Sequence, residues 1–415
     1  MNVELQINNS TAAAAQFLGW CPAACRIRVT STAGLASPAG AIPPTVPVTL
    51  SAASAVGGGA VQFRSGTTGA FNSTLNLVLP TGGASVSFFA AGVFGQASTN
   101  PGDVTIEARR GGTLVGSARV MVRVRKNAES LTSGERNRFI GAMAQLNNQG
   151  LGRFRDFRNM HVAASDPEMH QDNGFLSWHR AYLLDLEREL QAIDPSVALP
   201  YWRFDQPAPS IFTLDFLGVS NTIGTVQFSP GNPLRFWTTD GMLGINRRPL
   251  FSTAAGTPFG ILSETGTFQL GNPGATFANF SRMEGNPHGT AHVGFGGSIS
   301  SPSTAPKDPL FFLLHCNVDR LWAKWQKQKS RLDPSAAPSF DNSSTRIGHR
   351  LNDTMWPWNL STTPPRPSFP APGGNLAPSP FLSAPGPAPR VRDLIDYPGT
   401  ATGTPLGFDY DDVPF

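Results

Sequence analysis

Charged residues, cysteines and long apolar runs are all scarce in this chain of 415 residues. Charged residues make up 14% of the chain, and the net charge of +4 is scattered rather than gathered into a basic, aromatic-rich patch, which argues against nucleic-acid binding. No apolar run reaches the length of about eighteen residues that a membrane-spanning helix needs. The first residues lack the basic and apolar regions of a secretory signal, so we expect a cytoplasmic protein, or export by another route.

The three cysteines, Cys21, Cys25 and Cys316, are too few to form a disulfide framework. Cys21 and Cys25 are close enough in sequence to pair, but their spacing favours neither a disulfide nor two thiols. Cys316 lies in an apolar stretch and is expected to be a buried thiol. Apolar residues, which make up 40% of the chain, must therefore supply the core.

Residues 1–125 have the pattern of an all-β domain. Short alternating runs are separated by glycine, proline and serine, and Gly111-Gly112 predicts a hairpin turn. This pattern indicates a β-sandwich, for which an immunoglobulin-like fold is the expectation. The region contains no histidine, so we expect a structural or docking module, with carbohydrate or partner binding left open.

Residues 126–330 change to helical patterns. The stretch from Phe175 to Leu190 has apolar residues at helical spacing, and a second helix is predicted to begin near Asp308 and Pro309. We therefore expect a multi-domain protein whose second part is a mainly α, four-helix-bundle core with long loops. Residues 331–415 are rich in proline and predict an arm and a C-terminal segment that closes this core.

The seven histidines carry the strongest signal for chemistry. His179 lies on the apolar stripe of its helix, where a single buried imidazole is usually only hydrogen-bonded. Six of the seven, however, fall into two groups of three, while His349 is left over and is expected to be a surface or capping residue. The first group is His161, His170 and His179, and the second is His288, His292 and His315.

Two sites with three imidazole ligands each are the economical interpretation. His288 and His292 are four residues apart, which places both rings on one face of a short helix. Such ligand sets suit copper or zinc, and the Glu-x-x-His pairs of di-iron bundles are absent. Because no H-E-x-x-H motif or cysteine ligand set occurs, copper is favoured over zinc. Two ions about 3.5–4 Å apart would have open positions for a diatomic molecule or a substrate oxygen.

The segments around these histidines resemble the tyrosinase family of type 3 copper proteins, which includes catechol oxidases and hemocyanins, and are most similar to bacterial tyrosinases. The resemblance implies that the first group binds copper A and the second binds copper B, with O2 as co-substrate and a small phenol as substrate. It spans most of Leu131 to Lys329 and is carried by Phe175 to Glu187, Leu199 to Trp202, Glu284 to His292 and Ala305 to Trp322.

The resemblance also implies catalytic roles near copper B. Glu284 matches a family glutamate that holds a water near copper B, although a carboxylate at a helix N-terminus is nearly as good an interpretation. Gly289 replaces the asparagine that often accompanies strong phenol hydroxylation, so o-diphenol oxidation is the safer expectation. Val293 is expected to line the substrate entrance and Phe311 to form an aromatic wall, with plain packing as the alternative for both.

Two further positions lie close to the second group. Asp319 is expected to form a structural ion pair with Arg180 or Arg320. Pro302 stands thirteen residues before His315, where plant members of the family often place a blocking phenylalanine, and this predicts an entrance open to bulky phenols.

The expected function is copper-dependent oxidation of o-diphenols to o-quinones with O2, and ortho-hydroxylation of monophenols is left open. Hemocyanin-like O2 binding without turnover and o-aminophenol oxidation are the alternatives within the family. A zinc hydrolase with Glu284 as general base is a weaker alternative. The physiological substrate, the oligomeric state and the task of the β domain are not predicted.

Overall fold

The computed structural model describes residues 1–36, 39–270, 275–364 and 366–415. The chain forms two compact units, of which the first combines Met1–Val124 with Gly407–Phe415 and the second is Arg125–Leu406. Among the described residues, no helix combines the length and apolar character that crossing a membrane requires.

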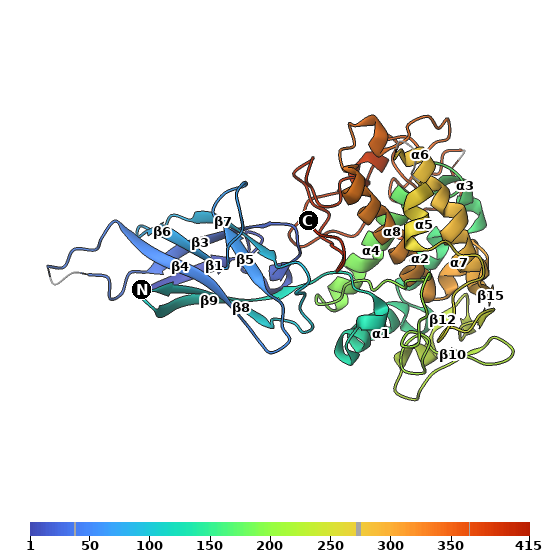
Figure 1. Cartoon of the computed structure of the whole chain (residues 1–415), viewed down its shortest axis with the longest axis horizontal. Helices are drawn as coiled ribbons and strands as arrows, with labels where there is room; N and C mark the ends of the chain where they lie inside the picture. Colours follow the sequence, from blue (N-terminus) through green and yellow to red (C-terminus); the bar gives the residue numbers. More distant parts are fainter. Residues whose placement is uncertain (37–38, 271–274, 365) are drawn as a thin grey trace. The chain divides into compact units, whose positions relative to one another are not determined.

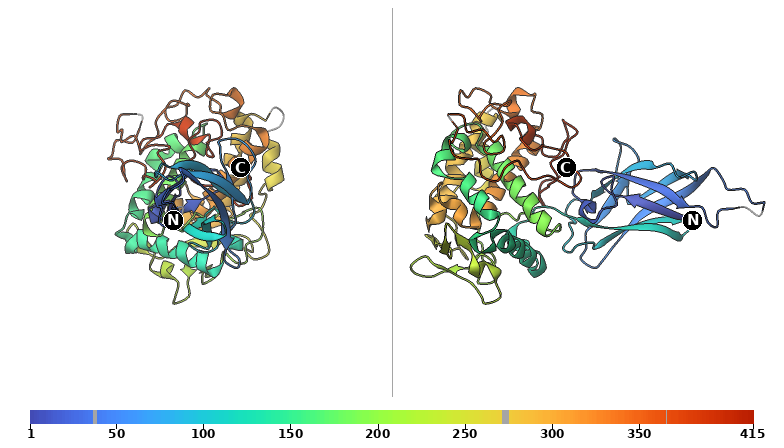
Figure 2. Two further views of the ribbon diagram at one scale, coloured as in Figure 1. Left: turned by 90° about the vertical axis from the view of Figure 1, so that its left-hand side faces the viewer. Right: turned by 180° about the vertical axis from the view of Figure 1, so that it is seen from behind.

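The first unit contains two β-sheets, shown from three sides in Figures 1 and 2. Strand β2 pairs in parallel with β9, and the other strand pairs in these sheets are antiparallel. The four-stranded sheet has the order β1 (Asn2–Gln6), β3 (Ala23–Ser31), β7 (Val86–Gly92) and β5 (Val61–Arg64). The five-stranded sheet has the order β2 (Phe17–Leu18), β9 (Thr113–Val122), β8 (Val104–Arg110), β4 (Thr45–Ser54) and β6 (Thr74–Pro80).

The predicted turn at Gly111-Gly112 is confirmed. It joins β8 to β9 as a two-residue loop between the paired residues Arg110 and Thr113. Both glycines have positive φ, 54° and 83°, which is the requirement of a tight hairpin turn whose twist matches the strands.

The last residues of the chain pack within this first unit. The backbone N–H of Trp20 donates to the Asp409 carboxylate at 2.7 Å, and the Trp20 indole N–H donates to the carbonyl of Tyr410 at 2.8 Å. The Cys21 thiol donates to Asp409 at 3.3 Å, and the Cys25 thiol donates to a backbone carbonyl. Cys21 and Cys25 are therefore two thiols rather than a disulfide.

The second unit is organised around two long helices, α4 (Phe175–Ile193) and α8 (Leu310–Lys329). The other helices are α1 (Ser133–Asn147), α2 (Phe154–Met160), α3 (Asp166–Met169), α5 (Glu264–Leu270), α6 (Phe277–Phe280) and α7 (Thr290–Val293), and most are labelled in Figure 1. Three small ladders lie among them: β10 (Val219–Ser220) with β11 (Val226–Gln227), β12 (Thr238–Thr239) with β13 (Met242–Leu243), and β14 (Arg247–Pro249) with β15 (Phe295–Gly297).

The expected fold class, an immunoglobulin-like sandwich followed by a four-helix-bundle core, is wrong. The structure mixes helices with substantial strand content, and α2, α3 and α7 are too short to form the layers of a bundle. His161 and His170 follow directly after α2 and α3, and His288 lies in a π-helical turn, Gly285–Gly289. α2 ends directly before His161 and α3 directly before His170, and Gly294 follows α7, so periodicity over a few residues does not extend into long helices here.

A buried ion cluster joins α4 to α8. Arg180 on α4 pairs with Asp319 on α8 at 2.5 Å, which confirms that predicted ion pair. Arg125 completes the cluster by pairing with the same Asp319 at 3.0 Å and with Glu187 at 2.7 Å. Two positive and two negative side chains thus balance one another out of water, which is the arrangement that buried charges require.

Candidate metal centre

Six imidazole rings gather in the second unit as two trios. Within each trio, one ring nitrogen of every histidine lies within 4.8 Å of the others. In the first trio the Nε2 atoms of His161 and His179 are 3.4 Å apart. In the second, the Nε2 atom of His315 lies 3.3 Å from that of His288 and 3.1 Å from that of His292. The Nε2 atoms therefore converge, as the ligands of one ion per trio would.

The two trios lie against each other. The rings of His179 and His315 stack with centroids 4.3 Å apart and planes 14° apart, so the two long helices each deliver one ring to the contact. His170 and His288 approach to 6.3 Å between centroids. Two ions held by these trios would be close neighbours.

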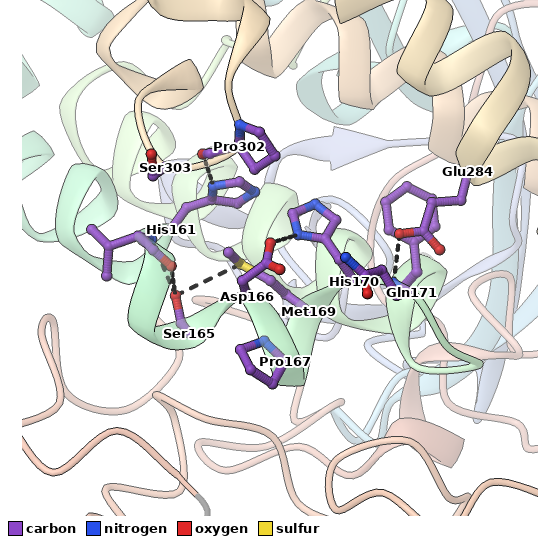
Figure 3. A network of polar contacts seen from close by, with 12 residues as sticks. His161, Ser165, Asp166, Pro167, Met169, His170, Gln171, Glu284, Pro302 and Ser303 are labelled. Atoms are coloured by element: carbon purple, nitrogen blue, oxygen red, sulfur yellow. Dashed lines mark hydrogen bonds and ion pairs between the residues drawn. The ribbon is translucent and has the colours of Figure 1, made fainter.

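Most of the rings are fixed through their outward nitrogen, Nδ1. Figure 3 shows the His161 Nδ1–H donating to the carbonyl of Pro302 at 2.7 Å and the His170 Nδ1–H donating to the Asp166 carboxylate at 2.8 Å. The Nδ1 atoms of the other rings are held by backbone carbonyls, namely His179 by Phe175 at 2.9 Å, His288 by Glu284 at 2.7 Å and His292 by Ile299 at 2.7 Å.

His315 differs from the other five rings, because its buried Nδ1 has no hydrogen-bond partner among the described residues. For the five fixed rings, an acceptor at Nδ1 places a proton there, so the neutral form of each ring turns an unprotonated Nε2 towards the trio. Such outer partners orient a metal-ligating imidazole and raise its basicity.

Burial favours the neutral form of five of the six imidazoles, those of His161, His179, His288, His292 and His315. Burial lowers the pKa of His161, His179, His288 and His315 well below the usual value, and neighbouring imidazoles lower it further. Burial lowers the pKa of His292 to about 4. Imidazole nitrogen donors without a carboxylate in either trio are the donor set that suits a copper ion, so these residues fit a pair of copper ions.

A cavity of about 550 Å³ opens beside the two trios. It reaches His170 of the first trio and His288 of the second, so a molecule bound there would contact the edge of both sites. Its wall also includes Asp166, Asp172, Glu284, Gly289 and Pro302.

The structure brings two of the four expected catalytic residues to this cavity. Glu284 and Gly289 line it, and Glu284 Oε1 accepts a hydrogen bond from the backbone N–H of Gln171 at 2.7 Å (Figure 3). Burial raises the pKa of the Glu284 carboxyl above its usual value. Phe311 is instead fully buried and stacks on His315 with centroids 4.1 Å apart, and Val293 is 61% exposed at the end of α7.

Three residues near the site have roles or positions that the sequence did not predict. Asp166 stands four residues before His170, a spacing that signals a carboxylate–imidazole contact on one helical turn. Pro302 lines the cavity as expected of an entrance residue, but its backbone carbonyl also holds His161, and a carbonyl has no signature in sequence. His349, expected at the surface or a cap, is fully buried.

Comparisons with known proteins agree with this metal centre. The family model for the common central domain of tyrosinase matches residues 151–328. A tyrosinase of Streptomyces antibioticus is 33% identical over 271 residues, covering 58% of this chain and 94% of that protein. A tyrosinase of Streptomyces glaucescens is 34% identical over 266 residues, covering 57% of this chain and 92% of that protein.

A more distant relative is the grixazone synthase of Streptomyces griseus, which is 26% identical over 303 residues and covers 58% of this chain and 95% of that protein. The matched region contains both histidine trios. The chain therefore belongs to the tyrosinase family of type 3 copper oxidoreductases, which use two copper ions to oxidise small phenols.

Proposed function

We propose that this protein oxidises o-diphenols to o-quinones with O2. The observation that carries the proposal is the convergence of six imidazole rings, five of them buried, into two adjacent trios beside a cavity of about 550 Å³. In this assignment His161, His170 and His179 hold copper A, and His288, His292 and His315 hold copper B.

When bound, the two copper ions supply the redox couple that passes electrons from the phenol to O2. The reaction balances as two o-diphenols and one O2 giving two o-quinones and two waters, with four electrons and four protons transferred. The protein's part is to hold six ligands in place, to exclude water behind the rings and to admit the phenol next to His170 and His288.

We assign Glu284 as the side chain that accepts the proton of the phenol. It lies in the cavity wall, and its raised pKa brings it closer to the range in which a carboxylate accepts and returns a proton. Because Oε1 is occupied by the Gln171 N–H, we assign Oε2 as the acceptor. Gly289 leaves the neighbouring position without an amide, so we propose that hydroxylation of monophenols is the weaker activity.

Metal analysis followed by substrate comparison tests the proposal. The protein is loaded with copper, the copper-to-protein ratio is measured, and quinone formation is followed with catechol, tyrosine and o-aminophenol. We expect two copper ions per chain and the fastest turnover with catechol.

Faster turnover of o-aminophenol than of catechol would replace the proposal with an aminophenol oxidase. A copper-loaded protein that binds O2 and turns over none of the three substrates would replace it with an oxygen carrier.

A further inference from the structure

The buried ring of His349 bridges the two sides of the loop between α3 and α4, from Pro167 in α3 to Gly174 at the start of α4. Its Nδ1 accepts a hydrogen bond from the backbone N–H of Gly174 at 2.9 Å, and its Nε2–H donates to the carbonyl of Pro167 at 3.0 Å. His170 lies near the middle of the segment between these two contacts. A single imidazole from a distant part of the chain therefore spans the segment that presents this histidine.

Neighbours of His349 bind the same loop along its length. Residues between 344 and 356 donate hydrogen bonds to two carboxylates and two backbone carbonyls of this segment. These contacts join Ser344 Oγ to Asp172 at 2.6 Å, the Arg346 guanidinium to the carbonyls of Pro167 and Gln171, and the Trp356 N–H to Glu168 at 2.9 Å.

Two glycines allow this close approach. A Cβ atom at Gly174 would lie 2.7 Å from the carbonyl oxygen of Gly348 and 2.9 Å from Nδ1 of His349. A Cβ atom at Gly348 would lie 2.8 Å from the Glu168 side chain, and Gly348 also has a positive φ of 83°. The two segments are thus packed backbone to backbone, with the His349 ring filling the space between them.

We infer that His349 is a positioning residue for His170, and hence for the proposed copper A site and the adjoining wall of the substrate cavity. The inference rests on the proposed assignment of His170 as a copper ligand. The loop needs an external support because it has no regular structure between α3 and α4, and Gln171 within it has a positive φ of 63°. His170, Asp172 and Gln171 all line the cavity, so fixing the loop fixes its wall as well.

Only one form of the ring fits this place. Gly174 offers a donor and Pro167 an acceptor, so the ring must be neutral, with its proton on Nε2. Burial is the largest cause and lowers the pKa of His349, and Arg346 lowers it further. The hydrogen bond to the Pro167 carbonyl and the carboxylates of Asp172 and Asp353 oppose this. A proton added to Nδ1 would face the Gly174 N–H, so acid breaks the bridge.

Substitution of His349 tests the inference through copper retention. His349→Ala removes both contacts, His349→Asn keeps an acceptor near the Nδ1 position, and His349→Gln keeps a donor near the Nε2 position. We expect the alanine variant to lose about 10–100-fold in affinity for one of its two copper ions, as losses of outer support typically do, and therefore to release that ion to a chelator faster than the unaltered protein. The asparagine and glutamine variants should fall between the two.

Electron paramagnetic resonance gives a second readout. One oxidised copper ion left without its neighbour has a single unpaired electron, so the alanine variant should develop the signal of one isolated Cu(II) per chain. We also expect its copper to be released at a higher pH than in the unaltered protein.

Asp396→Asn is a matched control for general loss of stability. Asp396 is also buried and lies in the same C-terminal part of the second unit, and it accepts hydrogen bonds from Thr400, Ala401 and Thr402. We expect this variant to lower the melting temperature of the copper-free protein while leaving the rate of copper release unchanged.

The outcomes separate the two claims. If the unaltered protein does not hold two copper ions, the proposed function fails. If it does, and His349→Ala releases copper at the unaltered rate, or no faster than Asp396→Asn does at an equal loss of melting temperature, then the positioning role is overturned.

Discussion

The two histidine trios are supported in different ways. In the second trio, the Nδ1 atoms of His288 and His292 are held by carbonyls only four and seven residues away. In the first trio, His161 is held by Pro302, 141 residues away, and the loop of His170 is bridged by His349. Asp166 and Phe175, each four residues away, hold His170 and His179 locally as well. The contacts of the second site therefore come from its own stretch of chain, whereas the first site adds contacts from distant segments to its local ones.

Histidine ligands of the same type can therefore differ in how firmly the surrounding chain holds them. A substitution in the C-terminal part of the second unit should weaken binding of copper A more than binding of copper B. The predictions below compare the two sites directly.

Removing one ligand from each trio should have the largest effect. His170→Ala and His288→Ala should each reduce copper from about two ions per chain to about one, and each should reduce catechol oxidation to background, because both ions take part in the reaction. Copper analysis and a quinone assay measure the two effects. Retention of two ions and normal turnover in either variant would contradict the ligand assignment.

Loss of the Asp166 carboxylate should weaken only copper A. Asp166 holds His170 through its side chain, so Asp166→Ala should lower copper affinity or activity about 10–100-fold. Glu284→Gln should leave copper B retention unchanged, because His288 is held by the backbone carbonyl of Glu284 and not by its side chain. Competition with a chelator measures both variants.

Asp172→Asn is the matched control, since Asp172 lines the same cavity and bonds to Ser344. Asparagine at position 172 keeps an acceptor for the Ser344 hydroxyl, so equal copper loss in the Asp166 and Asp172 variants would show that cavity charge, rather than the contact with His170, is responsible.

Acid should destabilise the copper-free protein. The folded-state pKa of His292 is about 4, below the unfolded value of 6.5, and burial also lowers the pKa of His161 and His179. The unfolded chain therefore binds more protons than the folded chain below pH 6.5, so this stability is present above that pH and is lost as pH falls towards about 4. Melting temperatures measured against pH should show this decline, and a flat profile would contradict it.

The smallest expected effect concerns the cavity wall beside copper B. A Cβ atom at Gly289 would meet only the carbonyl oxygen of Glu284, at 3.3 Å, so Gly289→Asn should be accommodated. By the resemblance to the family, the added amide should raise the ratio of tyrosine to catechol turnover a few-fold with little change in copper content. An unchanged ratio would show that Gly289 does not limit hydroxylation.

The sequence predicted the chemistry better than the architecture. The grouping of the histidines and their apolar setting predicted two trios and copper, because ligand type and spacing are properties of the residues themselves. The Arg180–Asp319 pair and the Gly111-Gly112 turn were also predicted, since each follows from local patterns.

The four-helix-bundle core was wrong because a histidine at the end of a helix of four or seven residues gives the same short periodicity as one within a long helix. The supports of the site were missed for a different reason. The carbonyls of Pro302 and Ile299 carry no side-chain signature, and the contacts of His349 lie 175 and 182 residues away along the chain.

The packing of Trp20 with Asp409 and Tyr410 has a consequence for dissecting the molecule. The β-rich unit is made from both ends of the chain, so the catalytic unit is inserted between its two pieces. A fragment that stops at residue 406 would deprive the Trp20 indole and backbone of their acceptors and uncover an aromatic ring that is 3% exposed in the intact protein. Separate production of the β-rich unit would therefore require splicing its final nine residues back onto the first 124, for example through a short glycine-rich linker.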